Sequence, residues 1–190
     1  LTPAQFIARA KESGLQLDQV VEVSDLTELV AALADNTAII VDPGRHVFED
    51  SDVLAEPAVK AKLPDWSRYS DHYDDGEIHD LHDIAIVGAG PDPTVILQPD
   101  SYAHVLAFRN VKGLALHGLA LGHRPDAGWC RGGVVKTIES SNVIVSESTL
   151  FGSGTEGLTL VTVDGLRIQD SVITDCSQSF STISSSRAIS

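Results

Sequence analysis

Histidine and acidic residues gather in one short stretch, from Asp71 to Asp83. Three histidines lie there among five aspartates and one glutamate. Imidazole and carboxylate groups together bind divalent metals, and carboxylates alone suit Ca²⁺. The stretch therefore predicts a site for Ca²⁺ or another divalent metal. The spacing matches no established metal motif, so a solvated acidic loop is the simpler interpretation. The candidate metal ligands are His72, His79, His82, Asp75 and Asp80.

A second candidate set combines aromatic and basic groups in the polar stretch 123–132. Its members are His123, Arg124, Trp129 and Arg131. An exposed indole beside a guanidinium suits stacking on a sugar ring. The alternative is that Trp129 folds back over an outer strand. The stretch predicts substrate binding by these four residues.

The elements that must position these groups repeat along the chain. Val143 recurs as Leu166, and Leu166 recurs as Ile189, each time 23 residues later. A period of this size, shared by several columns of residues, predicts a solenoid. The same step of 23 joins Val145 to Ile168, Leu150 to Ile173, Val135 to Leu158 and Thr137 to Leu160.

Within one period, apolar residues alternate with polar ones and glycines supply the bends, which is typical of short strands. Three strands per turn stack residue i on residue i+23 and bury continuous apolar columns. The sequence therefore predicts the rungs of a parallel β-helix. This register also predicts three outward columns: Lys136, Thr159 and Thr182; Ala115, Ile144 and Arg167; and His117, Ser146 and Gln169.

The segments at residues 142–148, 165–171 and 186–190 resemble rungs of the right-handed parallel β-helix proteins of the pectate-lyase-like superfamily. The resemblance covers roughly residues 20–190 and implies the right-handed fold. Lyases of this superfamily use a basic residue to take the proton beside a sugar carboxylate, which Ca²⁺ or arginine neutralises. By that implication Lys136, Arg167 and His117 are candidate catalytic residues. The family's arginine-centred motif and paired calcium aspartates are missing, so solvating side chains and a structural histidine are the alternatives.

The expected organisation is one β-helix domain over residues 1–190. A helical cap region at 1–36 contains helices at 3–13 and Leu26–Leu33, the first of which we expect to cover the open end of the stack. Rungs then fill residues 37–190, with insertions at 49–83 and 123–132. The expected intervals are 46 residues from Ile40 to Ile86, 30 from Ile84 to Leu114 and 29 from Leu114 to Val143.

Composition excludes several partners. The formal net charge of −14 opposes binding to nucleic acid and to anionic membranes, and no run of 18 apolar residues exists to span a bilayer. Cys130 and Cys176 are 46 residues apart, which is two periods, so two unlinked thiols are favoured over a disulfide.

The chain begins without methionine, which suggests a processed or trimmed product. The resemblance to the pectate-lyase-like superfamily implies an exported protein, located in the extracellular space or the periplasm. It stops within a rung, so we expect either that the natural chain continues or that two such ends pack as a homodimer. The expected function is to bind or process a polysaccharide on the lateral face. As an enzyme, it would be a lyase or glycoside hydrolase of uronate-containing glycan. The alternative is a non-catalytic structural or adhesive module that assembles through its exposed C-terminal rung.

Overall fold

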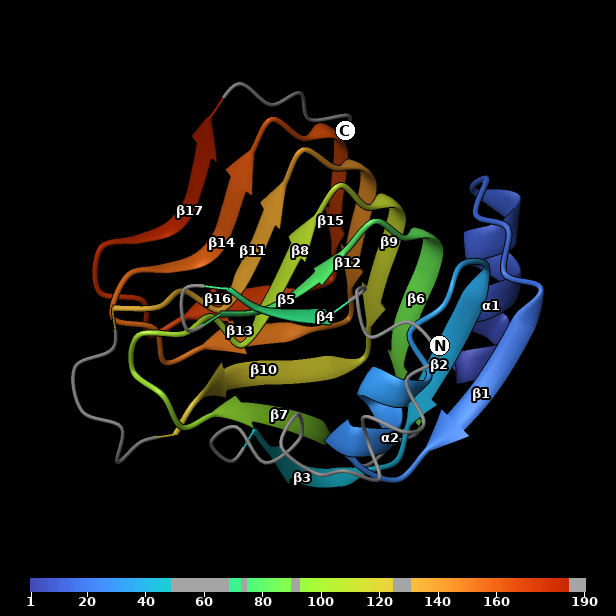
Figure 1. Cartoon of the computed structure of the whole chain (residues 1–190), viewed down its shortest axis with the longest axis horizontal. Helices are drawn as coiled ribbons and strands as arrows, with labels where there is room; N and C mark the ends of the chain where they lie inside the picture. The colour runs from blue at the N-terminus through green and yellow to red at the C-terminus, as the bar shows by residue number, and fades with distance from the viewer. Residues whose placement is uncertain (49–68, 73–74, 90–92, 125–130, 185–190) are drawn as a thin grey trace.

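The computed structural model describes residues 1–48, 69–72, 75–89, 93–124 and 131–184, mostly as β-strands in three sheets (Figure 1). All strand pairs are parallel except β4 with β5. Sheet A contains β1 (Gln19–Val23), β2 (Thr37–Val41), β6 (His82–Gly88), β9 (Lys112–His117), β12 (Ser141–Ser146) and β15 (Asp164–Gln169). Sheet B contains β3 (Gly44–Val47), β7 (Thr94–Gln98), β10 (Leu119–His123), β13 (Thr149–Phe151) and β16 (Val172–Thr174). Sheet C contains β4 (Tyr69–His72), β5 (Asp75–His79), β8 (Leu106–Arg109), β11 (Val135–Ile138), β14 (Glu156–Val161) and β17 (Ser179–Ser184).

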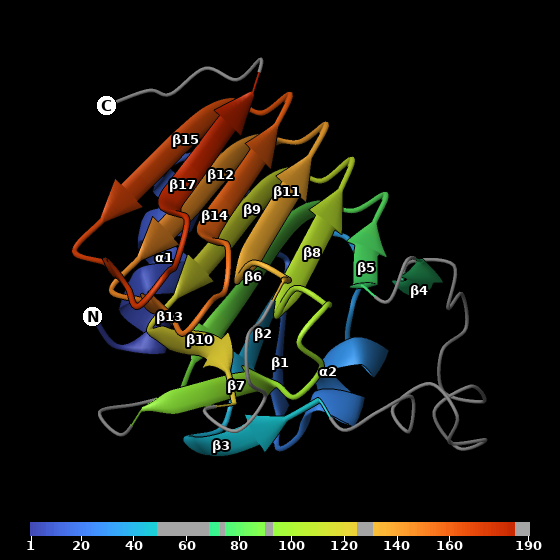
Figure 2. The same ribbon diagram turned by 90° about the vertical axis from the view of Figure 1, so that its left-hand side faces the viewer.

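From β6 onward the chain passes through sheets A, B and C in the same order four times. Figure 2 shows the resulting stack of parallel strands in successive layers. This arrangement is compatible with the parallel β-helix that the sequence predicts.

The predicted register is confirmed in most columns. Val143 pairs with Leu114 on one side and with Leu166 on the other, and Ile84 pairs with Leu114. The columns through Val135, Val145 and Leu150 also hold the predicted partners. One interval was wrong by a residue, because Ile39 rather than Ile40 pairs with Ile86. Both isoleucines lie in one apolar run, so alternation alone did not distinguish the inward residue.

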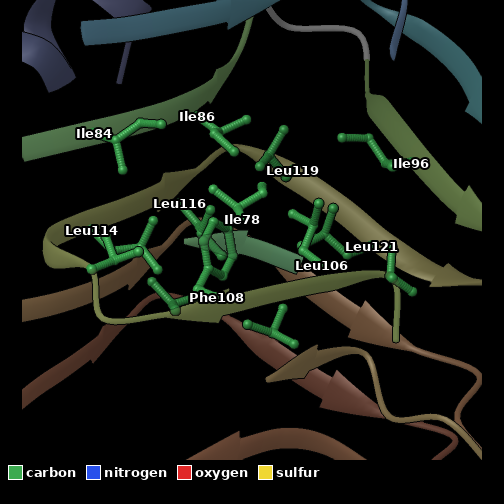
Figure 3. Packing of buried hydrophobic residues seen from close by; sticks show 14 of the residues in the cluster. Ile78, Ile84, Ile86, Ile96, Leu106, Phe108, Leu114, Leu116, Leu119 and Leu121 are labelled. Atoms are coloured by element: carbon green, nitrogen blue, oxygen red, sulfur yellow. The ribbon is translucent and has the colours of Figure 1, made fainter. Parts of the chain in front are cut away.

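The core consists of apolar columns that face inward from the three sheets. Ile84 and Leu114 of sheet A, Ile96 of sheet B and Phe108 of sheet C all have no exposed surface. Figure 3 shows these side chains pointing toward one another between the strands. Apolar residues at equivalent positions of successive layers therefore stack and form a continuous buried interior.

One residue at the start of each sheet A strand from β2 to β15 has a left-handed backbone conformation. Asn36, Asp83, Gly113, Asn142 and Gly165 have φ values of 58°, 53°, 83°, 52° and 83°. The paired residues on either side place them in one column. Glycine, asparagine and aspartate tolerate this conformation best, which explains the composition of the column.

Helix α1 (Pro3–Glu12) confirms the first predicted helix, with Thr2 as its N-cap. Its buried face, Phe6, Ile7 and Ala10, packs with outward residues of sheet A such as Ala85 and Ala115. The helix therefore covers the outer face of sheet A and, within the part of the chain that the structure describes, does not cover the end of the stack as predicted. This position follows from the run of small outward residues, which leaves room for a helix.

Helix α2 (Leu26–Ala31) confirms the second predicted helix, and its Leu29 and Val30 join the main core. Strand β1 was not predicted, although its Val20, Val21 and Val23 suit a strand. It pairs in parallel with β2 inside the region expected to be helical.

The boundary of the first insertion was also wrong. Strand β5 pairs with β8 as a regular member of sheet C, and β6 begins at His82, so β5 and the first two residues of β6 lie within the stretch assigned to the insertion at 49–83. The acidic composition of this stretch concealed β5. Among the described residues, none of the helices has the length and apolar character needed to cross a bilayer.

Candidate functional site

Arg131 and Gly132, the described residues at the end of the predicted substrate-binding stretch, lie beside the segment 99–105 between β7 and β8. The backbone N–H groups of Arg131 and Gly132 both donate to the carbonyl of Ser101. The guanidinium of Arg131 then lies over the ring of Tyr102, 5.7 Å from its centroid. Tyr102 is 60% exposed. We call this pair the Tyr102–Arg131 platform.

Gly132 permits the close approach of the two segments. A Cβ atom at this position would lie 2.0 Å from the carbonyl oxygen of Ala103. That oxygen belongs to the backbone and cannot move aside cheaply, so a side chain here would force the segments apart. The glycine thus sets the position of Arg131 relative to Tyr102.

His123, predicted to bind substrate, is only 2% exposed. Its Nε2 bonds to the Ala103 carbonyl at 2.9 Å, while its Nδ1 has no hydrogen-bond partner. Burial lowers the pKa of His123, and the bond to Ala103 opposes this shift. The buried imidazole therefore links β10 to the segment 99–105 by a hydrogen bond.

The other two members of this set are Arg124, which follows β10, and Trp129. The backbone N–H of Arg124 donates to the Gln98 carbonyl at 3.1 Å, which extends β10 along β7. Trp129 lies outside the described residues, so its stacking role stays a prediction.

His117, a predicted catalytic residue, lies on the outer face of sheet A beneath α1. Its ring stacks on Phe6, with centroids 4.0 Å apart, and its Nδ1 lies 2.9 Å from Ser146 Oγ. Burial lowers the pKa of His117, opposed by the Glu147 carboxylate and by hydrogen bonds to the backbone of Leu1 and Ser146. A neutral imidazole at neutral pH can act as a base.

Arg167, a second predicted catalytic residue, occupies the neighbouring column of sheet A, beside Ile144. It lines a narrow hollow of about 20 Å³ between α1 and β15. Arg9 of α1 and Ser146 line the same hollow, together with the carboxylates of Glu147 and Asp170. Neither guanidinium forms an ion pair with a residue that the structure describes.

A larger hollow of about 600 Å³ lies at the corner between sheets A and B. His117 and Gly118 form part of its wall, and Leu1 and Glu147 line both hollows. The Leu1 nitrogen lies 2.7 Å from the Glu147 carboxylate. His117 and Ser146 therefore face two adjoining hollows.

Lys136 does not join this group. It lies on β11 of sheet C, paired with Ala107 and Thr159, whereas Arg167 lies on β15 of sheet A. These two basic candidate catalytic residues therefore belong to different sheets. The outward columns of Lys136, Arg167 and His117 are each confirmed by the strand register.

The candidate metal ligands separate into small groups. His79 Nδ1 lies 2.9 Å from Asp80, whose other oxygen accepts a hydrogen bond from Asn110 at 2.6 Å. His82 lies between Asp35 at 3.3 Å and Asp83 at 3.6 Å. The described residues contain no cluster of three such ligands that would hold a metal. The side chains of His72 and Asp75 lie outside the described residues, so their metal role stays a prediction.

Sequence reasoning did not find one partly buried ion pair on sheet C. Arg109 Nε donates to Glu77 at 2.9 Å, and a second nitrogen of Arg109 lies 3.8 Å from Glu139. This pairing raises the pKa of Arg109. Placing β5 correctly would have revealed it, because Glu77 and Arg109 lie on neighbouring strands.

Tyr102 and Phe6 are further residues that the sequence did not identify as functional, since each was an isolated aromatic without a motif. Of the two cysteines, Cys176 is a free thiol and Cys130 lies outside the described residues.

No protein-family model matches the chain, and comparisons with curated proteins and with solved structures find no match. Its function is therefore argued from its own residues.

Proposed function

We propose that the protein binds a uronate-containing polysaccharide on its lateral surface, through the Tyr102–Arg131 platform. The observation that carries this proposal is the Arg131 guanidinium over the 60% exposed Tyr102 ring. An exposed aromatic ring offers its apolar surface to a sugar, and a guanidinium offers two parallel donors to a carboxylate. The ring and the guanidinium together can therefore bind one uronate sugar, the ring through the sugar's apolar face and the guanidinium through its carboxylate.

Backbone contacts support the platform as a binding surface. Arg131 and Gly132 both donate to Ser101, and Tyr102 N–H donates to Asp100 at 2.8 Å. The backbone that carries the ring and the guanidinium is therefore fixed by hydrogen bonds at both positions. Such preorganisation reduces the conformational entropy lost on binding.

The net charge of −14 opposes a polyanion at long range. At physiological ionic strength this repulsion is screened beyond about 8 Å, so local contacts decide binding. Arg131 supplies positive charge at the platform itself. We expect affinity to rise as salt is added from low ionic strength, until screening also weakens the arginine contacts.

The proposal includes the finer features of the fold and the location. We propose that the three sheets form a closed, right-handed β-helix. We further propose that α2 helps to cover the end of this β-helix at which β1 and β2 lie (Figure 1). Polysaccharides with uronate sugars are abundant outside cells, so the protein is proposed to act in the extracellular space or the periplasm.

Affinity electrophoresis and calorimetry with polygalacturonate, alginate and a neutral glucan test the proposal. We expect binding to the two polyuronates only, and a loss of about tenfold or more for Tyr102→Ala and Arg131→Gln. Arg45→Gln is the matched control, because Arg45 is exposed on β3 far from the platform in sequence. Unchanged affinity of both platform variants would exclude this site.

A second candidate function is assembly through the last strands. Leu116, Val145 and Ile168 form one inward column, and their exposures are 0%, 1% and 42%. Each sheet ends, among the described strands, at β15, β16 or β17, whose outer backbone edges are available for pairing. This end therefore suits contact with a second copy of the chain.

Sedimentation measurements test assembly. Ile168→Lys should shift the protein toward monomer, because a charge would then occupy the contact. Val172→Lys is the control, since Val172 is also exposed, at 55%, but lies on β16 in the outward column with Thr149 and Ala120. A monomeric wild-type protein at all concentrations would exclude this candidate.

A further inference from the structure

Ser146 differs from the other buried serines in its hydrogen bonding. Ser140 Oγ donates to the Ile138 carbonyl at 2.8 Å and accepts from the Val111 N–H at 3.1 Å. Ser148 and Ser153 likewise bond to backbone carbonyl and N–H groups. The partner of Ser146 Oγ among the described residues is instead the Nδ1 atom of His117, at 2.9 Å. Its hydroxyl is therefore paired with a potential base and not with the backbone.

His117 is held in one orientation for this contact. Phe6 stacks on its ring with an angle of 3° between the planes, and the residue is 2% exposed. Because burial lowers its pKa, the imidazole is neutral at neutral pH and its unprotonated nitrogen can accept a proton. A serine hydroxyl hydrogen-bonded to such a base is the arrangement that activates oxygen nucleophiles.

Positive charge lies in the same hollow as Ser146. Arg9 and Arg167 both line it, and neither forms an ion pair within the described residues. Glu147 and Asp170 also line it, so the hollow is polar and not uniformly cationic. Its volume of about 20 Å³ accommodates one oxygen-sized group. Guanidinium groups at such a position stabilise an oxyanion.

The adjoining hollow provides space for the rest of a substrate. Its volume is about 600 Å³, and His117, Leu119 and Ala120 contribute to its wall. It shares Leu1 and Glu147 with the narrow hollow. A small ester could therefore lie in the larger hollow with its carbonyl oxygen directed toward Arg9 and Arg167.

We propose that Ser146 is the nucleophile of an ester-hydrolysing site, with His117 as its general base. Ser146 Oγ forms a bond to the ester carbonyl carbon while its proton passes to His117 Nδ1. The bond to the leaving alcohol then breaks, and the alkoxide takes that proton from the imidazolium. Water next attacks the carbonyl carbon of the acyl-serine and gives a proton to His117. The bond between that carbon and Ser146 Oγ then breaks, Oγ takes the proton back from the imidazolium, and the carboxylic acid is released.

This inference goes beyond the proposed polysaccharide binding and does not depend on it. The Tyr102–Arg131 platform and the Ser146 site belong to different segments and can fail separately. Binding of polyuronate is measured without turnover, whereas ester hydrolysis is measured with a small acyl ester.

The first experiment uses the unaltered protein and a fluorophosphonate probe, which phosphonylates activated serines. Mass spectrometry of the digested product should find the modification on Ser146. The protein should also hydrolyse 4-nitrophenyl acetate with an initial burst of nitrophenol. A folded protein in which Ser146 stays unmodified would overturn the proposal.

Variants then assign the roles. Ser146→Ala should abolish labelling and the burst, and His117→Gln should slow both by about 100-fold or more, as expected for loss of a general base. Ser177→Ala is the matched control, because Ser177 is exposed, bonds to the Ser153 carbonyl and lines neither hollow. Hydrolysis that persists in a folded Ser146→Ala variant would also overturn the proposal.

Discussion

The ring of Phe6 lies flat against the imidazole of His117, with centroids 4.0 Å apart and planes 3° apart. This contact joins α1 to β9 across the outer face of sheet A. Phe6 is 4% exposed and packs with the small outward residues of the sheet. The stack therefore both attaches the helix and orients the histidine.

Replacing Phe6 by alanine should lower the free energy of unfolding by about 3–5 kcal/mol, because the large side chain leaves a cavity between helix and sheet. Urea denaturation followed by circular dichroism measures this loss. Glu12→Ala, on the exposed part of the same helix, should change stability by less than about 0.5 kcal/mol. Equal small effects of both changes would show that α1 is not docked through Phe6.

Stability should fall as the pH drops below the ordinary histidine pKa of 6.5, because the pKa of His123 is lowered by burial. Above that pH both folded and unfolded forms are neutral at this residue. Below it the unfolded chain gains a proton that the folded chain does not bind, which favours unfolding. Burial also lowers the pKa of His117, so this residue likewise decreases stability as the pH falls.

The His123→Leu variant checks this prediction. We expect the wild-type protein to lose more unfolding free energy than the variant between about pH 7.5 and about pH 5. Denaturant titrations at several pH values give the two curves. Parallel curves would mean that His123 is accessible to protons in the folded state.

The left-handed column at the entry to sheet A predicts a specific preference at Asn142, whose φ is 52°. Asn142→Gly should leave stability nearly unchanged, since glycine adopts this conformation freely. Asn142→Val should cost about 1–2 kcal/mol or more, because a β-branched side chain is strained there. Thermal denaturation of the two variants compares them, and equal melting temperatures would contradict the assigned backbone.

Two inward residues of one column should differ in their response to truncation. Leu116→Ala, at a position with no exposed surface, should cost about 2–5 kcal/mol, whereas Ile168→Ala, at 42% exposure, should cost less than about 1.5 kcal/mol. Urea denaturation at low protein concentration measures both. A cost for Ile168→Ala equal to that of Leu116→Ala would show that another part of the protein or a second copy covers this residue.

Much of the β-fold could be predicted from the sequence because its main cause is local and repeated. Val143, Leu166 and the other column members recur at a fixed interval, and alternation specifies which side chains face inward. The register through Lys136, His117 and Arg167 followed from the same period. The columns that hold these three residues were predicted correctly for this reason, whereas their catalytic role stays a prediction.

The sequence failed where a contact joins segments with no shared pattern. Strand β5 lies in an acidic stretch, so the pairing of Glu77 with Arg109 was concealed. Periodicity also did not show that Lys136 and Arg167 belong to different sheets. The repeat specifies which residues stack in register, whereas the turns between strands decide which sheet each strand joins.

By itself the sequence determined the strand period, the inward columns and the residues that tolerate left-handed corners, because each depends on neighbouring side chains and backbone sterics. Only the tertiary structure decided that α1 covers sheet A, that Phe6 meets His117, and that Arg131 lies over Tyr102. These contacts join residues far apart in the chain. They depend on the complementary shapes of packed surfaces, which no local pattern encodes.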